Sequence, residues 1–128
     1  MIILTLNDIL RAVPSLQEIS TKNFPGSTTF KIARLIRELD KEIQLFEIER
    51  DKIARKYGEK DENGNLITTE NGAVKIPDDL IMVCNEELDT LLKTQVEINA
   101  NKLTAEIFDR IEMTPTQAMD LEAIIDFE

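Results

Sequence analysis

The chain has 128 residues, of which 42% are hydrophobic and 31% are charged, with a net charge of −10. This length and composition predict a single folded domain over residues 1–128 and argue against global disorder. The chain contains no histidine and one cysteine. Because histidine is the usual proton carrier near neutral pH and a common zinc ligand, we expect neither a zinc site nor a serine or cysteine catalytic triad.

The N-terminal segment favours a short strand followed by a helix. Residues 1–6 (MIILTL) are rich in β-branched and leucine side chains, and Asn7 is placed to cap the helix. Pro14 removes a backbone donor, so we expect this helix to be broken or kinked. The start lacks the pattern of a secretion signal and no segment approaches the length of a membrane span, so we expect a cytoplasmic protein without membrane contact.

A long helix is predicted from the turn at residues 23–26 to about Tyr57. Ser27, Thr28 or Thr29 can cap its start, and Gly58 is expected to end it in the manner usual for a glycine after a helix. A row with heptad spacing gives the helix a seam that another helix must cover. The members of this row are Ile32, Ile36, Leu39, Ile43, Phe46, Arg50, Ile53 and Tyr57.

A hairpin and a second helix follow the long helix. Two Asn-Gly pairs, at residues 63–64 and 71–72, predict type I′ turns and a small hairpin between residues 66–69 and 73–76. Pro77 ends the second strand, and Asp78 begins a helix that reaches about Thr94. We expect this helix to cover the long helix in the antiparallel direction. Its predicted inward residues are Leu80, Ile81, Cys84, Leu88, Leu91 and Leu92.

The last part of the chain predicts a short strand and a final helix. Residues 96–102 alternate weakly between apolar and polar side chains. Thr114 is an N-cap with Pro115 at the first helical position and Gln117 closing a capping box, so a helix is expected to about Ile125. The predicted fold class is therefore α+β, mainly helical: a long antiparallel helix pair joined by a small β-hairpin, plus a short N-terminal strand and a C-terminal helix.

The remaining reactive side chains form no recognisable catalytic pattern. Cys84 lies in the apolar pattern of its helix, which predicts a buried, reduced thiol. Carboxylates are plentiful, so a magnesium site is one hypothesis, but no pair is singled out. The segment from Asp61 imitates the start of a calcium loop, yet Leu66 and Gly72 stand where that loop needs glycine and glutamate. We expect no catalytic residues, no cofactor and no metal.

The net charge is distributed unevenly along the sequence. Residues 22–60 contain ten basic and seven acidic residues, whereas residues 61–128 contain four basic and sixteen acidic ones. Acidic surfaces repel phosphate backbones, so we expect no direct nucleic-acid binding. The imbalance is explained either by solubility and internal complementarity or by an acidic face for a basic partner.

We predict that the protein contacts a partner through apolar residues outside the heptad row and through two neighbouring glutamates. A second apolar side of the long helix can be covered by the rest of the chain or by another molecule, including a second copy. The candidate contact residues are Leu35, Leu45, Ile48, Glu86 and Glu87.

The stretch KYGEKDENG at residues 56–64, followed later by the Thr-Pro-initiated helix and the ending LEAIIDFE at residues 121–128, resembles a family of small uncharacterised phage and prophage proteins. The resemblance implies a viral or prophage origin and a nonenzymatic role during infection or particle assembly. It implies a location in the host cytoplasm or in the virion, and it carries over no functional residues.

Three classes of function follow from these observations. The leading hypothesis is a non-catalytic phage or prophage accessory protein that acts by protein contact, as an assembly or morphogenesis factor. The alternative is an acidic inhibitor or nucleic-acid mimic that blocks a basic host protein surface. The third class is a magnesium-dependent enzyme built on carboxylates.

Overall fold

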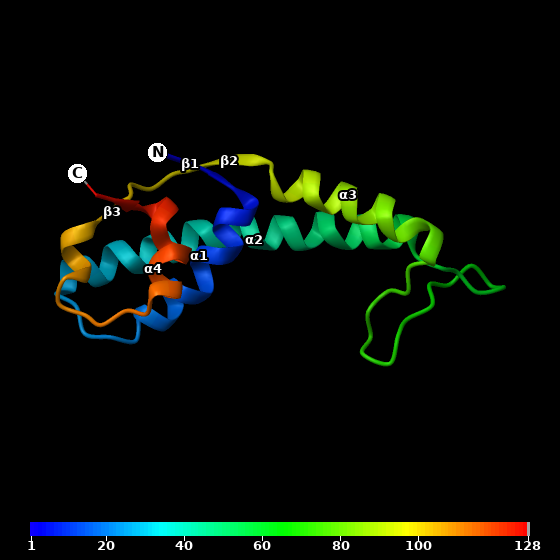
Figure 1. The fold of residues 1–128 in the computed structure, drawn as a ribbon, viewed down its shortest axis with the longest axis horizontal. Helices are drawn as coiled ribbons and strands as arrows, with labels where there is room; N and C mark the ends of the chain where they lie inside the picture. The colour runs from blue at the N-terminus through cyan, green and yellow to red at the C-terminus, as the bar shows by residue number, and fades with distance from the viewer. Residues whose placement is uncertain (128) are drawn as a thin grey trace. The chain divides into compact units, whose positions relative to one another are not determined.

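Helix α2, Gly26–Tyr57, is the longest element of the structure, a computed structural model that describes residues 1–127 (Figure 1). The fold is α+β and mainly helical, as predicted. The chain divides into two compact units. Unit 1 contains residues 1–44 and 94–127, and unit 2 contains residues 45–93. The expectation of one domain over residues 1–128 stays a prediction.

Unit 1 begins with strand β1, Ile2–Thr5, and helix α1, Leu6–Ile19. Thr5 caps α1: its side-chain oxygen accepts a hydrogen bond from the Asp8 amide at 3.1 Å, and the Asp8 carboxylate accepts one from the Thr5 amide at 3.1 Å. The prediction of Asn7 as the cap was therefore wrong, because the helix starts one residue before it. Two reciprocal bonds satisfy two amides that would otherwise lack partners.

Helix α1 continues through Pro14 without the break that the sequence suggested. A proline inside a helix costs about 3 kcal/mol. Buried residues lie on both sides of it, and burying each large one contributes about 1.5–3 kcal/mol. The apolar stripe therefore outweighs the lost hydrogen bond. Its buried members are Leu6, Ile9, Ala12, Val13, Leu16 and Ile19.

The strands of unit 1 form two small pairs. Strand β2, Gln95–Ile98, lies antiparallel to β1 and pairs Ile98 with Ile2. Strand β3, Leu103–Thr104, lies parallel to β4, Ile125–Asp126. A 3₁₀ turn, η2 (Ala105–Phe108), follows β3.

Helix α4, Pro115–Leu121, begins with the predicted capping box. The Thr114 side chain accepts from the Gln117 amide at 3.1 Å, and the Gln117 side chain accepts from the Thr114 amide at 3.0 Å. The helix was predicted to reach about Ile125. Helix α4 continues as the 3₁₀ turn η3, Glu122–Ile124, and Ile125 then pairs with β3.

The core of unit 1 lies between α1, the first part of α2 and the C-terminal elements. Ile32 and Leu39 of the heptad row are fully buried there, and so is Leu35, which lies outside the row. The row thus identifies only part of the buried face of α2. The largest fully buried side chains of the unit are Ile9, Leu16, Ile19, Ile32, Leu35, Leu39, Ile98, Leu121 and Ile124.

Helix α2 starts one residue before the predicted caps. Gly26 is its first residue, and the amide of Thr29 donates to the carbonyl of Pro25 at 3.0 Å. Ser27, Thr28 and Thr29 therefore lie inside the first turn, and the prediction of one of them as N-cap was wrong. The hydroxyl of Thr29 donates to the Pro25 carbonyl at 3.2 Å instead.

Unit 2 contains the end of α2, a connecting segment, the 3₁₀ turn η1 (Asp78–Leu80) and helix α3 (Ile81–Leu92). Figure 1 shows α3 running beside the end of α2 in the opposite direction, which is the predicted antiparallel pair. Phe46 and Cys84 are the buried hydrophobic residues of this unit within the described chain. The predicted buried, unpaired thiol is confirmed.

The connection between the two helices is a hairpin segment with two turns of the same kind. Gly64 and Gly72 have φ of 82° and 80°, and their amides donate to the carbonyls three residues earlier, Asp61 and Thr69. Within residues 1–127 no other residue type has a positive φ. Type I′ turns need positive φ at both central residues, so that prediction was wrong. The geometry is that of a type I turn followed by a glycine bulge.

Three stretches of this segment are joined in a ring of backbone hydrogen bonds. The amide of Ile67 donates to Glu59 at 2.8 Å, that of Lys75 to Ile67 at 2.9 Å, and that of Glu59 to Lys75 at 2.8 Å. Each stretch therefore contacts both others although their ladders are only isolated bridges. The closed arrangement leaves fewer unpaired amides than an open hairpin of the same length.

Helix α2 ends just before Gly58, as predicted, and close packing explains why a glycine stands there. Gly58 is not among the positive-φ glycines. A Cβ atom there would lie 2.6 Å from Cγ1 of Val74, 2.7 Å from Cδ2 of Leu66 and 3.0 Å from the carbonyl oxygen of Ala54. These distances leave no room for a methyl group unless the side chains of Val74 and Leu66 move.

Gly58→Ala is therefore expected to destabilise unit 2 by about 1–3 kcal/mol, because overpacking displaces the neighbouring side chains. Gly26→Ala is the matched control, since a Cβ at Gly26 meets nothing within 4 Å. Urea unfolding monitored by circular dichroism measures both. An equal effect of the two substitutions would contradict the packing explanation.

Candidate functional site

The candidate contact residues of α2 have different surroundings in the two units. Leu35 is only 1% exposed and belongs to the core of unit 1, so it is not available to a partner. Leu45 and Ile48, in unit 2, are 57% and 53% exposed. Because they are three residues apart on one helix, their side chains share a face. Leu45 and Ile48 are therefore the apolar pair that remains open on the part of α2 that belongs to unit 2.

The two candidate acids also differ. Glu86 is exposed, and its backbone carbonyl accepts a hydrogen bond from the Thr90 hydroxyl. Glu87 is half-buried and is engaged within unit 2: its carboxylate accepts from the Tyr57 hydroxyl and, at 2.8 Å, from the Lys56 ammonium. Glu87 is thus part of the tie between α2 and α3, whereas Glu86 is free to face solvent.

Lys56, Tyr57 and Glu87 form the polar cluster of unit 2. The Lys56 ammonium also lies over the Tyr57 ring, 5.1 Å from its centroid. The hydrogen bonds that Tyr57 and Lys56 donate to the Glu87 carboxylate raise the pKa of both donors, and they lower the pKa of Glu87. Each shift favours the state in which the tyrosine and lysine are protonated and the carboxylate is charged.

The directions of the three pKa shifts define the pH range in which the cluster stabilises unit 2. The folded-state pKa of Glu87 lies below its ordinary 4.5, so its contribution is present above that value and is lost as pH falls through the folded pKa. The folded-state pKa values of Tyr57 and Lys56 lie above 10.0 and 10.5, so their contributions are present below those values. They are lost as pH rises through the folded pKa values. The tie between α2 and α3 is complete between these limits.

Glu87→Ala is expected to lower the pKa of Tyr57 toward its ordinary value of 10.0, because the main cause of its rise is removed. The chain has one tyrosine and no tryptophan. Ultraviolet absorbance of the tyrosinate therefore reports this residue alone. Glu86→Ala, which removes the neighbouring exposed carboxylate, is the control. An unchanged tyrosine pKa in Glu87→Ala, or the same fall in both variants, would argue against the cluster.

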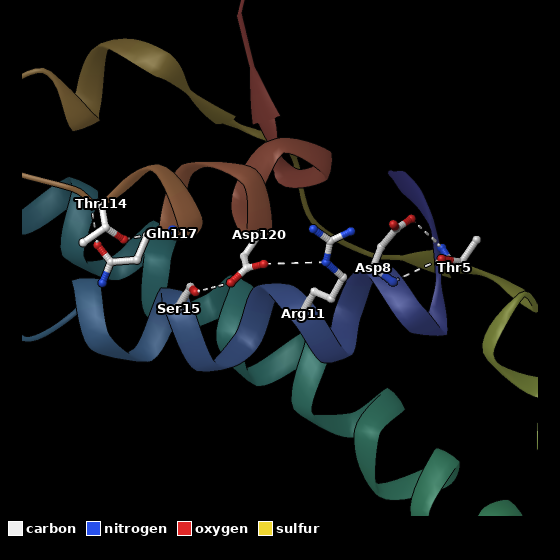
Figure 2. A network of polar contacts seen from close by, with 7 residues as sticks. All are labelled: Thr5, Asp8, Arg11, Ser15, Thr114, Gln117 and Asp120. Atoms are coloured by element: carbon white, nitrogen blue, oxygen red, sulfur yellow. Dashed lines mark hydrogen bonds and ion pairs between the residues drawn. The ribbon is translucent and has the colours of Figure 1, made fainter. Parts of the chain in front are cut away.

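A second polar cluster joins α1 to α4 in unit 1 (Figure 2). The Ser15 hydroxyl donates to Oδ2 of Asp120 at 2.9 Å, and Nε of Arg11 lies 3.5 Å from Oδ1 of the same carboxylate. Ser15 is buried, so its hydroxyl is shielded from water and needs a partner within the protein, which the hydrogen bond to Asp120 provides. A cavity of about 170 Å³ beside this cluster includes Arg11, Asp120 and Glu122 in its lining.

The chemistry of this second cluster favours structural support. A serine nucleophile needs a base that removes its proton and is itself oriented by a third group. Here the Asp120 carboxylate accepts the hydrogen bond of the Ser15 hydroxyl through one oxygen and pairs with Arg11 through the other, so both oxygens have partners. Across residues 1–127, no three histidine, cysteine or carboxylate side chains come together as metal ligands.

Comparisons with known proteins do not place the chain in a family. No protein-family model, curated protein or solved structure matches it. In the part of the chain that the structure describes, no helix has the length and apolar character needed to cross a bilayer.

Sequence reasoning missed both polar clusters. Ser15 and Asp120 are 105 residues apart, and Tyr57 and Glu87 are 30 apart, so no local motif joins them. Weak signals existed nonetheless: Ser15 interrupts the apolar stripe of α1, and Tyr57 is the last member of the heptad row. A polar group on an otherwise apolar face indicates a partner across the interface.

Proposed function

We propose that this protein is a non-catalytic accessory factor that acts by binding another protein through unit 2. Following the resemblance noted in its sequence, we propose that it is encoded by a phage or prophage and serves assembly or morphogenesis in the host cytoplasm or the virion. The observation that carries the proposal is the incomplete cover of the apolar residues of unit 2.

The helix pair of unit 2 buries little of its apolar surface. Phe46 and Cys84 are buried, whereas Ile53, Leu88 and Leu91 are half-buried. Two helices side by side cover one stripe of each other and leave both flanks open, and helical bundles usually close such flanks with further helices. A partner that supplies this cover would bury area that contributes about 25 cal/mol per Å².

The face of α2 that carries Leu45 and Ile48 gives the proposal a specific surface. At about 3.6 residues per turn, Leu45 and Ile48 lie about 80° and 140° around α2 from Leu35, which shares the face of the buried Phe46. The exposed pair therefore forms a separate face of the helix, and the described chain leaves more than half of each side chain open. Exposed apolar neighbours on one helix face are typical of protein interaction sites.

Ile48→Gln is expected to weaken partner binding by about ten-fold or more, because removing a central apolar contact of an interface typically costs above 1 kcal/mol. The matched control is Met82→Gln, which alters an exposed apolar residue of α3. Both positions are exposed, so both variants should keep their fold. Light scattering tests self-association, and quantitative affinity capture from infected cells tests viral and host partners.

The expected pattern is a protein, or a second copy of this chain, that binds the wild type and Met82→Gln but not Ile48→Gln. A monomer that captures no protein with this pattern would overturn the proposal. The inhibitor hypothesis gains no specific support: the acids of residues 61–126 are divided between the two units, and Glu87 and Asp120 are paired within the chain.

A further inference from the structure

A cavity in unit 1 collects three cationic side chains and no acidic one. Its volume is about 340 Å³, and Lys31, Arg34 and Lys102 are in its lining. Across residues 1–127, none of the three makes an ion pair. Asn99 and Asn101 add side-chain amides to the same wall. The cavity therefore has a positive charge that the described part of the chain does not neutralise.

The fold brings these residues together from distant parts of the sequence. Lys31 and Arg34 are three residues apart on α2, so they share one face of the helix. Lys102 precedes Leu103, whose buried side chain and parallel pairing with Ile125 fix the start of β3. The position of Lys102 opposite α2 is thus set by the core of unit 1 and not by local sequence.

The clustering of the three cations sets the cavity apart, and not their lack of ion pairs, since nine of the 15 basic residues make no ion pair within residues 1–127. Neighbouring like charges repel, which costs stability. The chain has 25 acidic residues against 15 basic ones, so counter-charges are plentiful elsewhere. Solubility does not require unpaired cations in a protein whose net charge is already −10. An anionic ligand accounts for a cluster that neither folding nor solubility explains.

The donors indicate which anion fits. A guanidinium presents several N–H groups to an oxyanion, ammonium groups add point charges, and Asn amides can donate further hydrogen bonds. Three uncompensated cations suit a group with more than one negative charge, and a phosphate monoester carries about −1.5 to −2 at neutral pH. The volume lies within the range of about 300–1,000 Å³ that is typical of small-molecule sites.

We propose that this cavity binds a compact phosphate-bearing small molecule through Lys31, Arg34 and Lys102. A long polyanion is disfavoured because the net charge of −10 repels it beyond the immediate site, whereas a compact ligand meets the local cations within a Debye length of about 8 Å. The site is in unit 1 and is independent of the protein contact proposed for unit 2.

A second hollow lies beside the cavity. It helps to distinguish a nucleotide from a ligand that is recognised by its phosphates alone. It shares Arg34 with the cavity and is also lined by Phe30, Arg37 and Glu38, and the carboxylate of Glu38 is paired with Lys41 at 3.0 Å. The Phe30 ring is 80% exposed. An exposed aromatic ring beside cations offers a stacking surface to a nucleobase. Adenosine diphosphate that binds more tightly than pyrophosphate would assign a nucleotide, and equal affinities would assign a ligand recognised by its phosphates alone.

Calorimetry with sodium pyrophosphate on the full chain at low salt tests the proposal. Arg34→Gln and Lys102→Gln are each expected to weaken binding by about ten-fold, the loss of one charge-assisted contact. Lys22→Gln is the control, because it removes the same charge from an exposed residue of unit 1 that does not line the cavity. Amide chemical shifts at residues 31–34 and 99–103 should change on binding.

Several results would overturn the proposal. These are an absence of pyrophosphate binding, an equal loss of binding in Lys22→Gln, and tighter binding of the dicarboxylate succinate. Tighter binding of a short single-stranded DNA through the same cations would also overturn it, since the ligand would then be a polymer. All substituted cations are exposed, so the variants are expected to fold as the wild type does.

Discussion

Phe46→Ala is expected to lower the free energy of unfolding of unit 2 by about 3–5 kcal/mol, because a buried aromatic ring is lost and a cavity is left. Phe46 is only 6% exposed and is one of two buried hydrophobic residues that the structure shows in this unit. Arg50 also lies over its ring, 5.6 Å from the centroid. With so small a core, the neighbours can compensate little for the missing ring.

Phe30→Ala is the matched control for this prediction, since the same substitution removes a ring that is 80% exposed. We expect it to change stability by no more than about 0.5 kcal/mol. Urea unfolding gives the free energies, and amide hydrogen exchange locates the loss, which should fall on α3. Equal effects of the two substitutions would contradict the assignment of Phe46 as the centre of unit 2.

Leu39→Ala is expected to destabilise unit 1 by about 3 kcal/mol, within the range observed for fully buried leucines. Leu39 is 0% exposed. It lies on the part of α2 that the rest of unit 1 covers, so the cavity would open inside a closely packed core. Hydrogen exchange should report the loss in α1 and β1.

Leu45→Ala provides the comparison on the same helix, because Leu45 is exposed. The expected change is within about 0.5 kcal/mol. Thermal unfolding of both variants at one protein concentration measures the difference. A large effect of Leu45→Ala in a monomeric protein would show that the chain itself covers this residue, and would count against the proposed partner surface.

The two proposals concern different units and different interactions: apolar contact with a protein in unit 2 and electrostatic binding of an anion in unit 1. Unit 2 offers apolar side chains with incomplete cover, which favours a protein partner. Unit 1 is closed around its core and offers a cationic cavity, which favours a small anion. The tests are separable, because Ile48→Gln leaves the cavity intact and Arg34→Gln leaves the apolar pair intact. A partner whose binding depends on pyrophosphate would link the two sites.

Much of the local structure could be predicted because its causes are local. The end of α2 at Tyr57, the capping box at Thr114 and the burial of Cys84 follow from side-chain type and spacing alone. The antiparallel helix pair follows from the apolar seam and the hairpin connection between its members, and it joins residues 30 positions apart, Tyr57 and Glu87. The other features depend on residues within a few positions of each other.

Other local predictions were wrong where two rules competed. Pro14 predicted a broken or kinked helix, and the break does not occur because the apolar stripe on both sides of it holds α1 together. The Asn-Gly pairs indicated type I′ turns, but the structure places each glycine one position later in a bulged turn. Gly58 follows α2 as its helix-ending signal predicted, but that signal did not indicate its close packing against Val74 and Leu66.

The sequence by itself determined the helices, their apolar faces and the absence of histidine chemistry, because these depend on composition and spacing. Only the tertiary structure decided which apolar residues stay open. Ile32 and Ile53 both belong to the heptad row of one helix, but Ile32 is buried in unit 1 and Ile53 is only half-buried in unit 2. Likewise, Lys102 joins Lys31 and Arg34 only through the packing of β3. Burial and charge clustering arise from contacts between distant segments, which spacing along one segment does not contain.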